Sequence, residues 1–246
     1  MNVVVLQPSY IPWRGVFDQI QRADIFVFYD DVQYDKHGFR NRNQIKTAQG
    51  KIWLTVPVRC RGNLIEQTPI HKIEIVWDKS WPQRHWTSLR QSYSKAPHFK
   101  TYAPLLEQFY ARRDRLLADF TIDFTVTLAR ELGFTETKFL RSSEMNLPFE
   151  GTATDRLLTL LKRLGATHYI SGPSAQGYVE EDKFARAGLP LEYMKYDYVE
   201  YPQLYPPYDP FVSVLDLLFM TGPNAASFIR QRSDANAQSA TDPSVL

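Results

Sequence analysis

The chain opens with VVVL at residues 3–6, which runs directly into QPSYIPWRG at residues 7–15 and then VFDQI at residues 16–20. A run of four apolar residues, three of them β-branched, is typical of a buried strand. Val16, Phe17 and Ile20 are spaced as on one face of a helix. We therefore expect a strand, a loop and a helix in succession, which is how an α/β fold begins.

The loop at residues 7–15 is the first candidate for a binding site. In open α/β sheets, ligands bind where the carboxyl ends of strands meet the amino ends of helices, because unpaired backbone N–H groups and the helix dipole point into that crevice. Two prolines make this loop stiff, and Tyr10 and Trp13 give it aromatic surface. The alternative is a structural crossover whose aromatic residues fill the core.

The composition is that of an ordinary globular protein. The chain has 246 residues, of which 43% are hydrophobic and 23% charged, and a formal net charge of +2, so nonspecific binding to nucleic acid is not expected. Cys60 is the only cysteine, which excludes an internal disulfide and a cysteine-rich metal site. The chain begins with a strand rather than a signal peptide and has no apolar run of about 18 residues, so we expect a cytoplasmic protein without a membrane span.

The remaining sequence predicts alternating strands and helices around a helical middle. Parallel pairing is expected because the first two strands are joined by a helix. The predicted strands are residues 25–29, 51–58, 70–76, 137–143, 167–170 and 189–194. The predicted helices are residues 81–93, 102–111, 113–132, 154–164 and 212–220. The fold class is therefore α/β, with a parallel-sheet core and a mainly helical segment at about 80–133.

Three polar loops should meet at one edge of this sheet: residues 7–15, 30–46 and 171–178. The second carries Arg40, Arg42 and Lys46 beside the amides of Asn41 and Asn43. Guanidinium groups suit phosphate or carboxylate, so an anionic small molecule is the expected ligand. The alternative is a solvated run of charges.

Two residues of the second loop are candidates for a general base, Asp31 and His37. Neighbouring residues of a strand point to opposite sides, so only one of Asp30 and Asp31 should face the crevice. A metal site would need a third ligand that the sequence does not supply, and no metal is predicted. His85, within a predicted helix, is expected at the surface.

The third loop contains SGPS at residues 171–174, which places a glycine and two hydroxyl groups at an expected helix start. Backbone N–H groups at such a start bind anions. A plain serine cap is the alternative.

Several of these segments resemble the WbqC-like protein family: residues 7–17, 30–34, 41–43, 53–57, 171–173, 201–205 and 213–219. The resemblance implies one domain over residues 1–230, with the helical insertion at about 80–133 and a flexible tail at 231–246. It also implies a bacterial protein that modifies amino sugars or related amines in the biosynthesis of polysaccharides such as O-antigen.

The opening strand, loop and helix are also similar to those of nucleotidylyltransferases of the HxGH type, whose fold is Rossmann-like. Ser213 could stand for the late serine of their pattern. The chain departs from that pattern because residues 12–15 contain no histidine. Either the nucleotide chemistry is lost, or Arg14 and the Arg42 region bind the phosphates.

These observations predict an enzyme that transfers an acyl or aminoacyl group to the amine of a sugar nucleotide or similar metabolite. Asp31 or His37 would deprotonate the amine. A nucleotidyl transferase that adenylates its substrate, and a non-catalytic binding or assembly protein using the aromatic segment 198–208, are the alternatives. Neither a cofactor nor an oligomeric state can be predicted. The residues expected to bind the substrate are Gln7, Tyr10, Trp13, Gln33, Tyr34, Arg40, Asn41, Arg42, Asn43, Lys46, Ser171, Gly172, Ser174, Tyr205 and Ser213.

Overall fold

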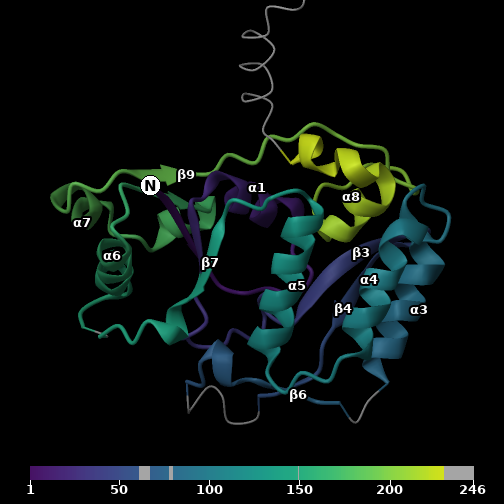
Figure 1. The fold of residues 1–246 in the computed structure, drawn as a ribbon, viewed down its shortest axis with the longest axis horizontal. Helices are drawn as coiled ribbons and strands as arrows, with labels where there is room; N and C mark the ends of the chain where they lie inside the picture. The colour runs from purple at the N-terminus through teal and green to yellow at the C-terminus, as the bar shows by residue number, and fades with distance from the viewer. Residues whose placement is uncertain (61–66, 78–79, 149, 230–246) are drawn as a thin grey trace, which may run out of the picture.

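A computed structural model describes residues 1–60, 67–77, 80–148 and 150–229 of the chain, so the predicted tail at 231–246 lies outside the described residues. Its centre is a parallel sheet of five strands in the order β7-β2-β1-β8-β9 (Figure 1). The strands are β1 (Asn2–Leu6), β2 (Ile25–Phe28), β7 (Lys138–Arg141), β8 (His168–Ser171) and β9 (Leu191–Tyr193). Numbered along the chain, this order is 3-2-1-4-5, the order of a doubly wound Rossmann sheet. The predicted fold class is confirmed.

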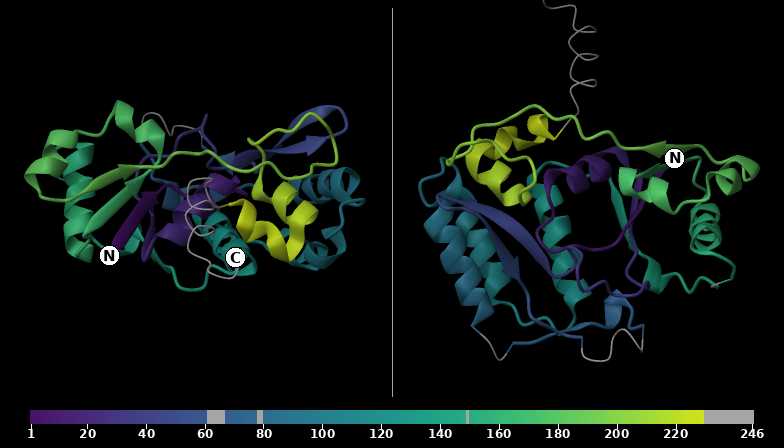
Figure 2. Two further views of the ribbon diagram at one scale, coloured as in Figure 1. Left: turned by 90° about the horizontal axis from the view of Figure 1, so that it is seen from above. Right: turned by 180° about the vertical axis from the view of Figure 1, so that it is seen from behind.

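The sheet is buried on both faces, as its near-continuous apolar strands require. Val3 and Val5 of β1 pack against α6 (Ala153–Leu164) and α7 (Glu181–Arg186). Val4, between them, faces the other way, into the core formed with α1 (Arg14–Arg22) and α5 (Leu117–Glu131). Figure 2 shows the two helix layers on opposite sides of the strands.

The helical middle packs onto the sheet as part of the same core. It consists of α3 (Trp81–Tyr93), α4 (Phe99–Ala111) and α5. The prediction for α3 is confirmed, whereas α5 begins at Leu117 rather than at residue 113. Asp114 does not cap α5, because its carboxylate accepts hydrogen bonds from the guanidinium of Arg112 (2.7 and 2.9 Å).

An antiparallel hairpin lies beside the parallel sheet and was not predicted. β3 (Arg42–Thr47) pairs with β4 (Gly50–Thr55), so the polar second loop becomes a strand halfway along its length. The predicted strand at 70–76 is wrong for most of its length: Ile70–Lys72 form a 3-10 turn and only β6 (Glu74–Ile75) is a strand, paired with β5 (Val58–Arg59). Beyond the sheet, α8 (Val214–Thr221) follows an extended segment rich in tyrosine and proline.

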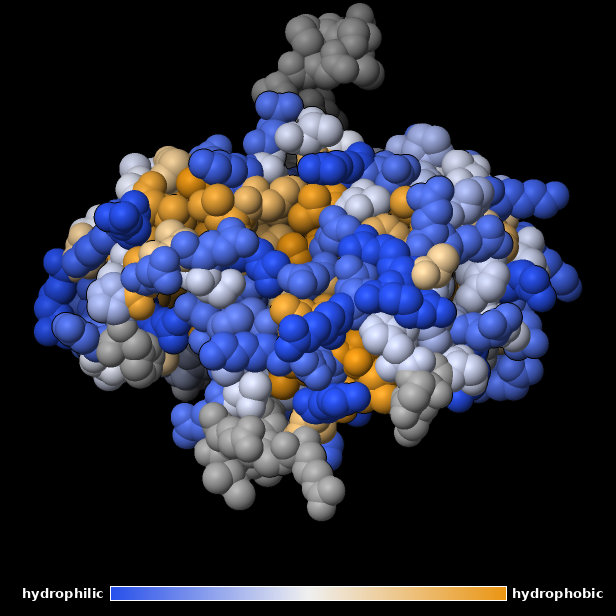
Figure 3. Space-filling view, turned by 60° about the horizontal axis from the view of Figure 1, so that its bottom comes forward, coloured by the Kyte–Doolittle hydropathy of each residue, from blue (hydrophilic) through white to orange (hydrophobic). Residues whose placement is uncertain are grey.

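The surface is polar over wide areas, and on the face in Figure 3 the hydrophobic residues gather in limited patches between hydrophilic ones. None of the helices in the described part of the chain is both long and apolar enough to cross a membrane.

Candidate functional site at the switch point of the sheet

A cavity of about 370 Å³ lies at the carboxyl ends of the neighbouring strands β1 and β8. From β1 the chain continues towards β2 and from β8 towards β9, so the two connections leave in opposite directions. In doubly wound sheets this switch point is the usual place for a ligand, because the two loops separate and leave a crevice. The cavity is lined by four segments that are distant in sequence. Its lining residues are Leu6, Ser9, Pro12, Trp13, Val16, Gln19, Phe39, Arg40, Asn43, Gln44, Gly172, Pro173, Ser174, Tyr196 and Phe211.

The first loop is held in a strained conformation at the edge of this cavity. Ile11 is fully buried and has a φ of 36°, a conformation that costs a β-branched residue energy. The side-chain amide of Asn43 donates to the carbonyl oxygens of Tyr10 (3.2 Å) and Ile11 (2.9 Å). The backbone N–H of Val214, the first residue of α8, donates to the carbonyl of Pro12 (2.9 Å). These bonds from other segments fix the loop in position.

Trp13 forms one wall together with two other aromatic residues. Its ring meets the edge of Tyr196 at a centroid distance of 4.8 Å and lies 5.9 Å from Phe211. Gly15 is needed here, because a Cβ atom at that position would overlap the Trp13 indole. The side chain of Phe211 is 64% exposed and that of Phe39 is 49% exposed. Large apolar side chains left open at a cavity are typical of a binding site for a ligand with a flat ring.

Arg40 supplies the charge of the cavity. Burial lowers the pKa of its guanidinium to about 10, so the group stays positively charged at neutral pH. Its Nη1 donates to the carbonyl of Pro8 (3.3 Å), while its Nε is buried without a hydrogen-bond partner among the described residues. The nearby carboxylate of Asp35 raises the pKa of this guanidinium, so the charge has one acidic neighbour. The buried Nε is still a donor without an acceptor, which a carboxylate or phosphate oxygen of a ligand could supply.

Gln19 is the second group with an unpaired polar atom. Its Nε2 donates to the hydroxyl of Tyr196 (2.7 Å), and its Oε1 is buried without a partner in the described structure. Opposite these groups, Gly172 brings the backbone close: a Cβ atom there would lie 3.4 Å from the Tyr196 hydroxyl. Ser174 lines the cavity from a short 3-10 turn, Pro173–Gly177, rather than from the predicted α-helix.

Of the predicted binding residues, the structure brings Trp13, Arg40, Asn43, Gly172 and Ser174 together in this lining. Among the described residues, no cluster of three or more histidine, cysteine, aspartate or glutamate side chains could hold a metal ion.

Three other polar residues of the second loop lie outside the lining. Arg42 stacks over the ring of Trp53 (4.6 Å) and donates to the carbonyl of His37 (2.6 Å). Asn41 donates from its amide to the carbonyl of Val56 (2.8 Å). The ammonium group of Lys46 binds Gln203 (2.5 Å) and so holds the tyrosine-rich segment. Each of these side chains has at least one structural partner, although Oδ1 of Asn41 is buried without a hydrogen-bond partner among the described residues.

Tyr10 is fully buried and has no surface to offer a ligand. Its hydroxyl hydrogen-bonds Nδ1 of His85 (2.9 Å) and the hydroxyl of Tyr110 (2.7 Å). The expectation that His85 lies at the surface is wrong, because its side chain is only 5% exposed, and burial lowers its pKa to about 4. His85 is therefore a neutral member of the core.

The other predicted binding residues also lie apart from the lining. Ser213 caps α8 by accepting from the N–H of Leu215 (3.3 Å), and Tyr205 donates to the carbonyl of Ser92 (2.8 Å). Tyr34 and Ser171 are buried, Gln33 is exposed, and Gln7 is half-buried.

The two candidate bases have different surroundings. Asp31 pairs with the guanidinium of Arg156 and accepts a hydrogen bond from Ser142 (2.6 Å). Asp30 is fully buried and accepts from Arg141 (2.8 Å). His37 is exposed, three residues before Arg40.

Arg14, considered for the phosphates, is only 3% exposed. Its guanidinium stacks over Tyr198 (4.5 Å) and donates to the carbonyls of Val199 (2.9 Å) and Phe228 (3.1 Å). It therefore joins α1 to the C-terminal segment.

Ten lining residues were not among the predicted binding residues, and the larger polar and aromatic ones include Gln19, Tyr196, Phe39 and Phe211. Gln19 could have been found, because it lies four residues after Gly15 and thus on the same face of α1. Tyr196 follows β9 at the carboxyl edge of the sheet, where a lining residue is expected. For Phe211 we find no signal in the sequence.

Known proteins are similar to this protein over almost the whole chain. The model of the WbqC-like protein family matches residues 7–228. The uncharacterized protein Rv1507c of Mycobacterium tuberculosis (strain ATCC 25618 / H37Rv) is 37% identical over 231 residues, which is 93% of this chain and 97% of that protein. No solved structure matches the chain.

Proposed function

Because the chain belongs to the WbqC-like protein family, we propose that it binds an amino sugar nucleotide, or a related anionic amine, in the switch-point cavity and transfers an acyl or aminoacyl group to the amine. The pathway would be the biosynthesis of a bacterial polysaccharide. The observation that carries the proposal is the half-buried, positively charged Arg40, whose buried Nε lacks a hydrogen-bond partner in the described structure and which lines a cavity with aromatic walls.

Each part of such a ligand has a matching group in the lining. The phosphates would bind Arg40, because a guanidinium forms charge-assisted hydrogen bonds with phosphate oxygens. A base or sugar ring would lie against Trp13, with Phe39 and Phe211 at the opening. Gln19 Oε1 would accept a hydrogen bond from a hydroxyl or amine.

In the transfer, the amine nitrogen would form a bond to the acyl carbon, the leaving group would depart with its electron pair, and the nitrogen would lose a proton. Among the residues that line the cavity there is no carboxylate, imidazole, thiol or amine. The rate would therefore depend mainly on holding the two substrates in position. His37, which precedes Arg40 in the same loop, is the candidate base.

This lack of acid–base groups in the lining also favours a second candidate function, a binding protein that presents a sugar nucleotide to another enzyme. The two functions require the same ligand and differ only in whether a product forms.

The experiment measures the affinity for UDP-glucosamine by calorimetry in the unaltered protein, in Arg40→Met and in Arg42→Met. The two variants remove the same charge from the same loop, but only Arg40 lines the cavity. Loss of a charged hydrogen bond should weaken binding roughly ten- to hundredfold in Arg40→Met. Arg42→Met should bind within about twofold of the unaltered protein, since its guanidinium is occupied by Trp53 and His37.

Equal losses in both variants, or no binding of UDP-glucosamine, UDP-N-acetylglucosamine or UDP, would contradict the proposal. Incubation with UDP-glucosamine and acetyl-CoA, followed by mass spectrometry for the amide, separates transfer from binding alone. Pyrophosphate release from ATP in the presence of a carboxylate would instead indicate adenylation.

A further inference from the structure

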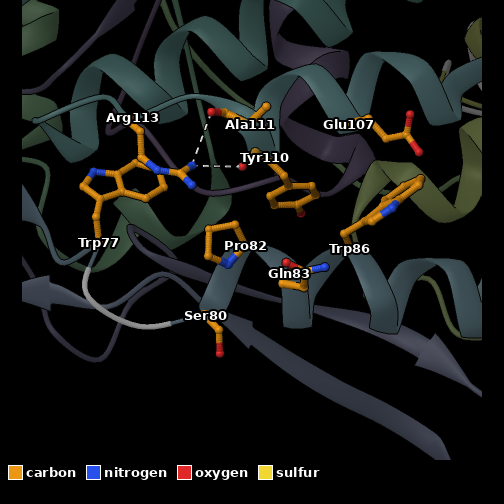
Figure 4. Close-up of a pocket in the computed structure, with 9 residues that line it drawn as sticks. All are labelled: Trp77, Ser80, Pro82, Gln83, Trp86, Glu107, Tyr110, Ala111 and Arg113. Carbon is orange, nitrogen blue, oxygen red and sulfur yellow. Dashed lines mark hydrogen bonds between the residues drawn. The ribbon is translucent and has the colours of Figure 1, made fainter.

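A second cavity, of about 540 Å³, lies between α3 and α4, outside the parallel sheet. Figure 4 shows Trp77 and Trp86 at its two ends, with Pro82 and the ring of Tyr110 between them. The remaining residues that line it are Ser80, Gln83, Glu107, Ala111 and Arg113. It shares no lining residue with the switch-point cavity.

The aromatic surface of this cavity is held rigidly. Trp86 stacks on Phe99 at a centroid distance of 5.8 Å and an angle of 14°, so one face of its ring is covered within the protein. Tyr110 is 5% exposed and its hydroxyl is already bonded to Tyr10 (2.7 Å). The tyrosine is therefore a buried part of the floor of the cavity, and its hydroxyl is not available to a ligand.

Arg113 covers the other end. Its guanidinium lies 5.0 Å from the ring of Trp77, and its Nη1 donates to the carbonyls of Tyr110 (3.4 Å), Ala111 (3.3 Å) and Arg112 (2.7 Å). These are the free carbonyls at the end of α4, so part of the positive charge of Arg113 is used by the helix.

The groups available for hydrogen bonds are spread around the flat surface. Glu107 stands above Trp86, Gln83 below it, and Arg113 at the far end beside Trp77 (Figure 4). The side chains of Glu107 and Gln83 are exposed and form no hydrogen bond with the described residues that the structure records. A carboxylate, an amide and a guanidinium each bind two neighbouring donors or acceptors at once.

This arrangement excludes several kinds of ligand. Among the described lining residues, the positive charge of Arg113 is balanced by the negative charge of Glu107, so these residues give phosphate no net electrostatic attraction. The acidic and basic groups lie at opposite ends (Figure 4), whereas the α-amino and α-carboxyl groups of an amino acid would need them side by side. A lipid chain would meet too many polar groups.

We propose that this cavity is a binding site for a neutral saccharide. A pyranose ring has an apolar C–H face, which suits the half-buried ring of Trp86, and hydroxyl groups around its edge, which suit Glu107, Gln83 and Arg113. The site is separate from the sugar-nucleotide site proposed above, and its test does not depend on that function.

The experiment is saturation-transfer NMR and calorimetry on the full-length protein with the methyl glycosides of glucose, galactose, mannose and N-acetylglucosamine, and with maltotriose. We expect at least one of these probes to bind, and Glu107→Ala and Gln83→Ala to weaken it roughly tenfold each. Glu144→Gln, an exposed carboxylate outside the lining, is the control and should bind normally.

Trp86→Ala should abolish binding, but it removes a packed ring, so its unfolding curve has to be measured with it. Glu107 and Gln83 are exposed, and their variants keep the test decisive if Trp86→Ala fails to fold. Failure of all five probes to bind would overturn the proposal. So would binding that neither Glu107→Ala nor Gln83→Ala weakens, or binding that inorganic phosphate displaces.

Discussion

The carboxyl ends of β1 and β8 differ from the carboxyl ends of β2 and β7, although both pairs are neighbours in the same sheet. At the first pair, Arg40 and Gln19 keep buried polar atoms without partners among the described residues. At the second pair, Asp30 is bound by Arg141, Ser142 and Ser143. Charged residues of the same loop between β2 and β3 thus lie at an open site, in the case of Arg40, and in a saturated cluster, in the case of Asp30.

The difference arises from the residues that come directly after the neighbouring strand. β7 leads into Arg141–Ser143, which supply a cation and two hydroxyl groups to the aspartates of the β2 loop. β8 leads into Gly172, Pro173 and Ser174, which are small and uncharged and leave space beside Arg40. A charged loop is therefore a candidate site only where the adjacent loop cannot neutralise it.

The largest expected effect is on the saturated cluster. Asp30→Ala removes the fully buried one of the two carboxylates that bind Arg141, and only Asp119 (2.6 Å) remains. Removing one member of a buried ion pair typically costs about 3–5 kcal/mol. Urea unfolding should show a loss near the lower end of that range, since the Arg141 side chain is 23% exposed.

In the same variant, the affinity of the folded protein for UDP-glucosamine should be unchanged. Asp30→Asn, which keeps the hydrogen bonds of one oxygen, should lose less stability. A variant that unfolds like the unaltered protein but binds no nucleotide would reverse the comparison, and would assign the ligand to the β2 edge.

The second-largest expected effect is a loss of stability at low pH. It concerns His85, which is hydrogen-bonded to Tyr10 of the first loop. Burial lowers the pKa of His85 to about 4 from an ordinary value of 6.5. As the pH falls from 6.5 to 4, the unfolded chain binds a proton at this residue and the folded protein does not, so stability decreases across that window. This difference in pKa corresponds to a decrease of about 3 kcal/mol in the free energy of unfolding.

Urea unfolding curves measured at intervals from pH 7 to pH 4 test this decrease in the free energy of unfolding. His85→Gln is the matched control, because an amide can still hydrogen-bond the Tyr10 hydroxyl but does not titrate. The difference between the two stability curves should grow as the pH falls below 6.5. Parallel curves would mean that His85 is solvated and that the buried network does not support the loop.

The sequence predicted the parallel sheet because β1 and β2 are apolar runs joined by a helix whose apolar residues have regular spacing. It also predicted that the loops at residues 7–15, 30–46 and 171–178 meet at one edge of the sheet, and residues of all three line the cavity. It could not predict that Asp31 pairs with Arg156, 125 positions away, because such pairing depends on the packing of α6.

The hairpin of β3 and β4 illustrates a second limit of predicting the structure from the sequence. The sequence of β3 is typical of a polar loop because Ile45 is its one apolar residue. Lys46 is nevertheless buried, since Gln203 and the carbonyl of Pro207 satisfy its ammonium group. Pattern methods count such a residue as exposed, and only the tertiary partners show otherwise.

The smallest expected effect is on ligand affinity, and it compares a tryptophan that lines the switch-point cavity with one that lies outside it. Trp13 lines the cavity, whereas Trp53 is 44% exposed, stacks on Arg42 and lies outside the lining. Trp13→Ala should weaken the binding of UDP-glucosamine by about 1 kcal/mol, roughly fivefold, because one stacked ring contributes about that much. Trp53→Ala removes the same side chain next to the site and should leave the affinity within twofold, about the error of calorimetry. Trp13→Phe, which keeps an aromatic face, should recover most of the loss. If Trp53→Ala weakens binding as much as Trp13→Ala does, the ligand lies across the outer surface of the hairpin, and the unpaired Nε of Arg40 needs another explanation.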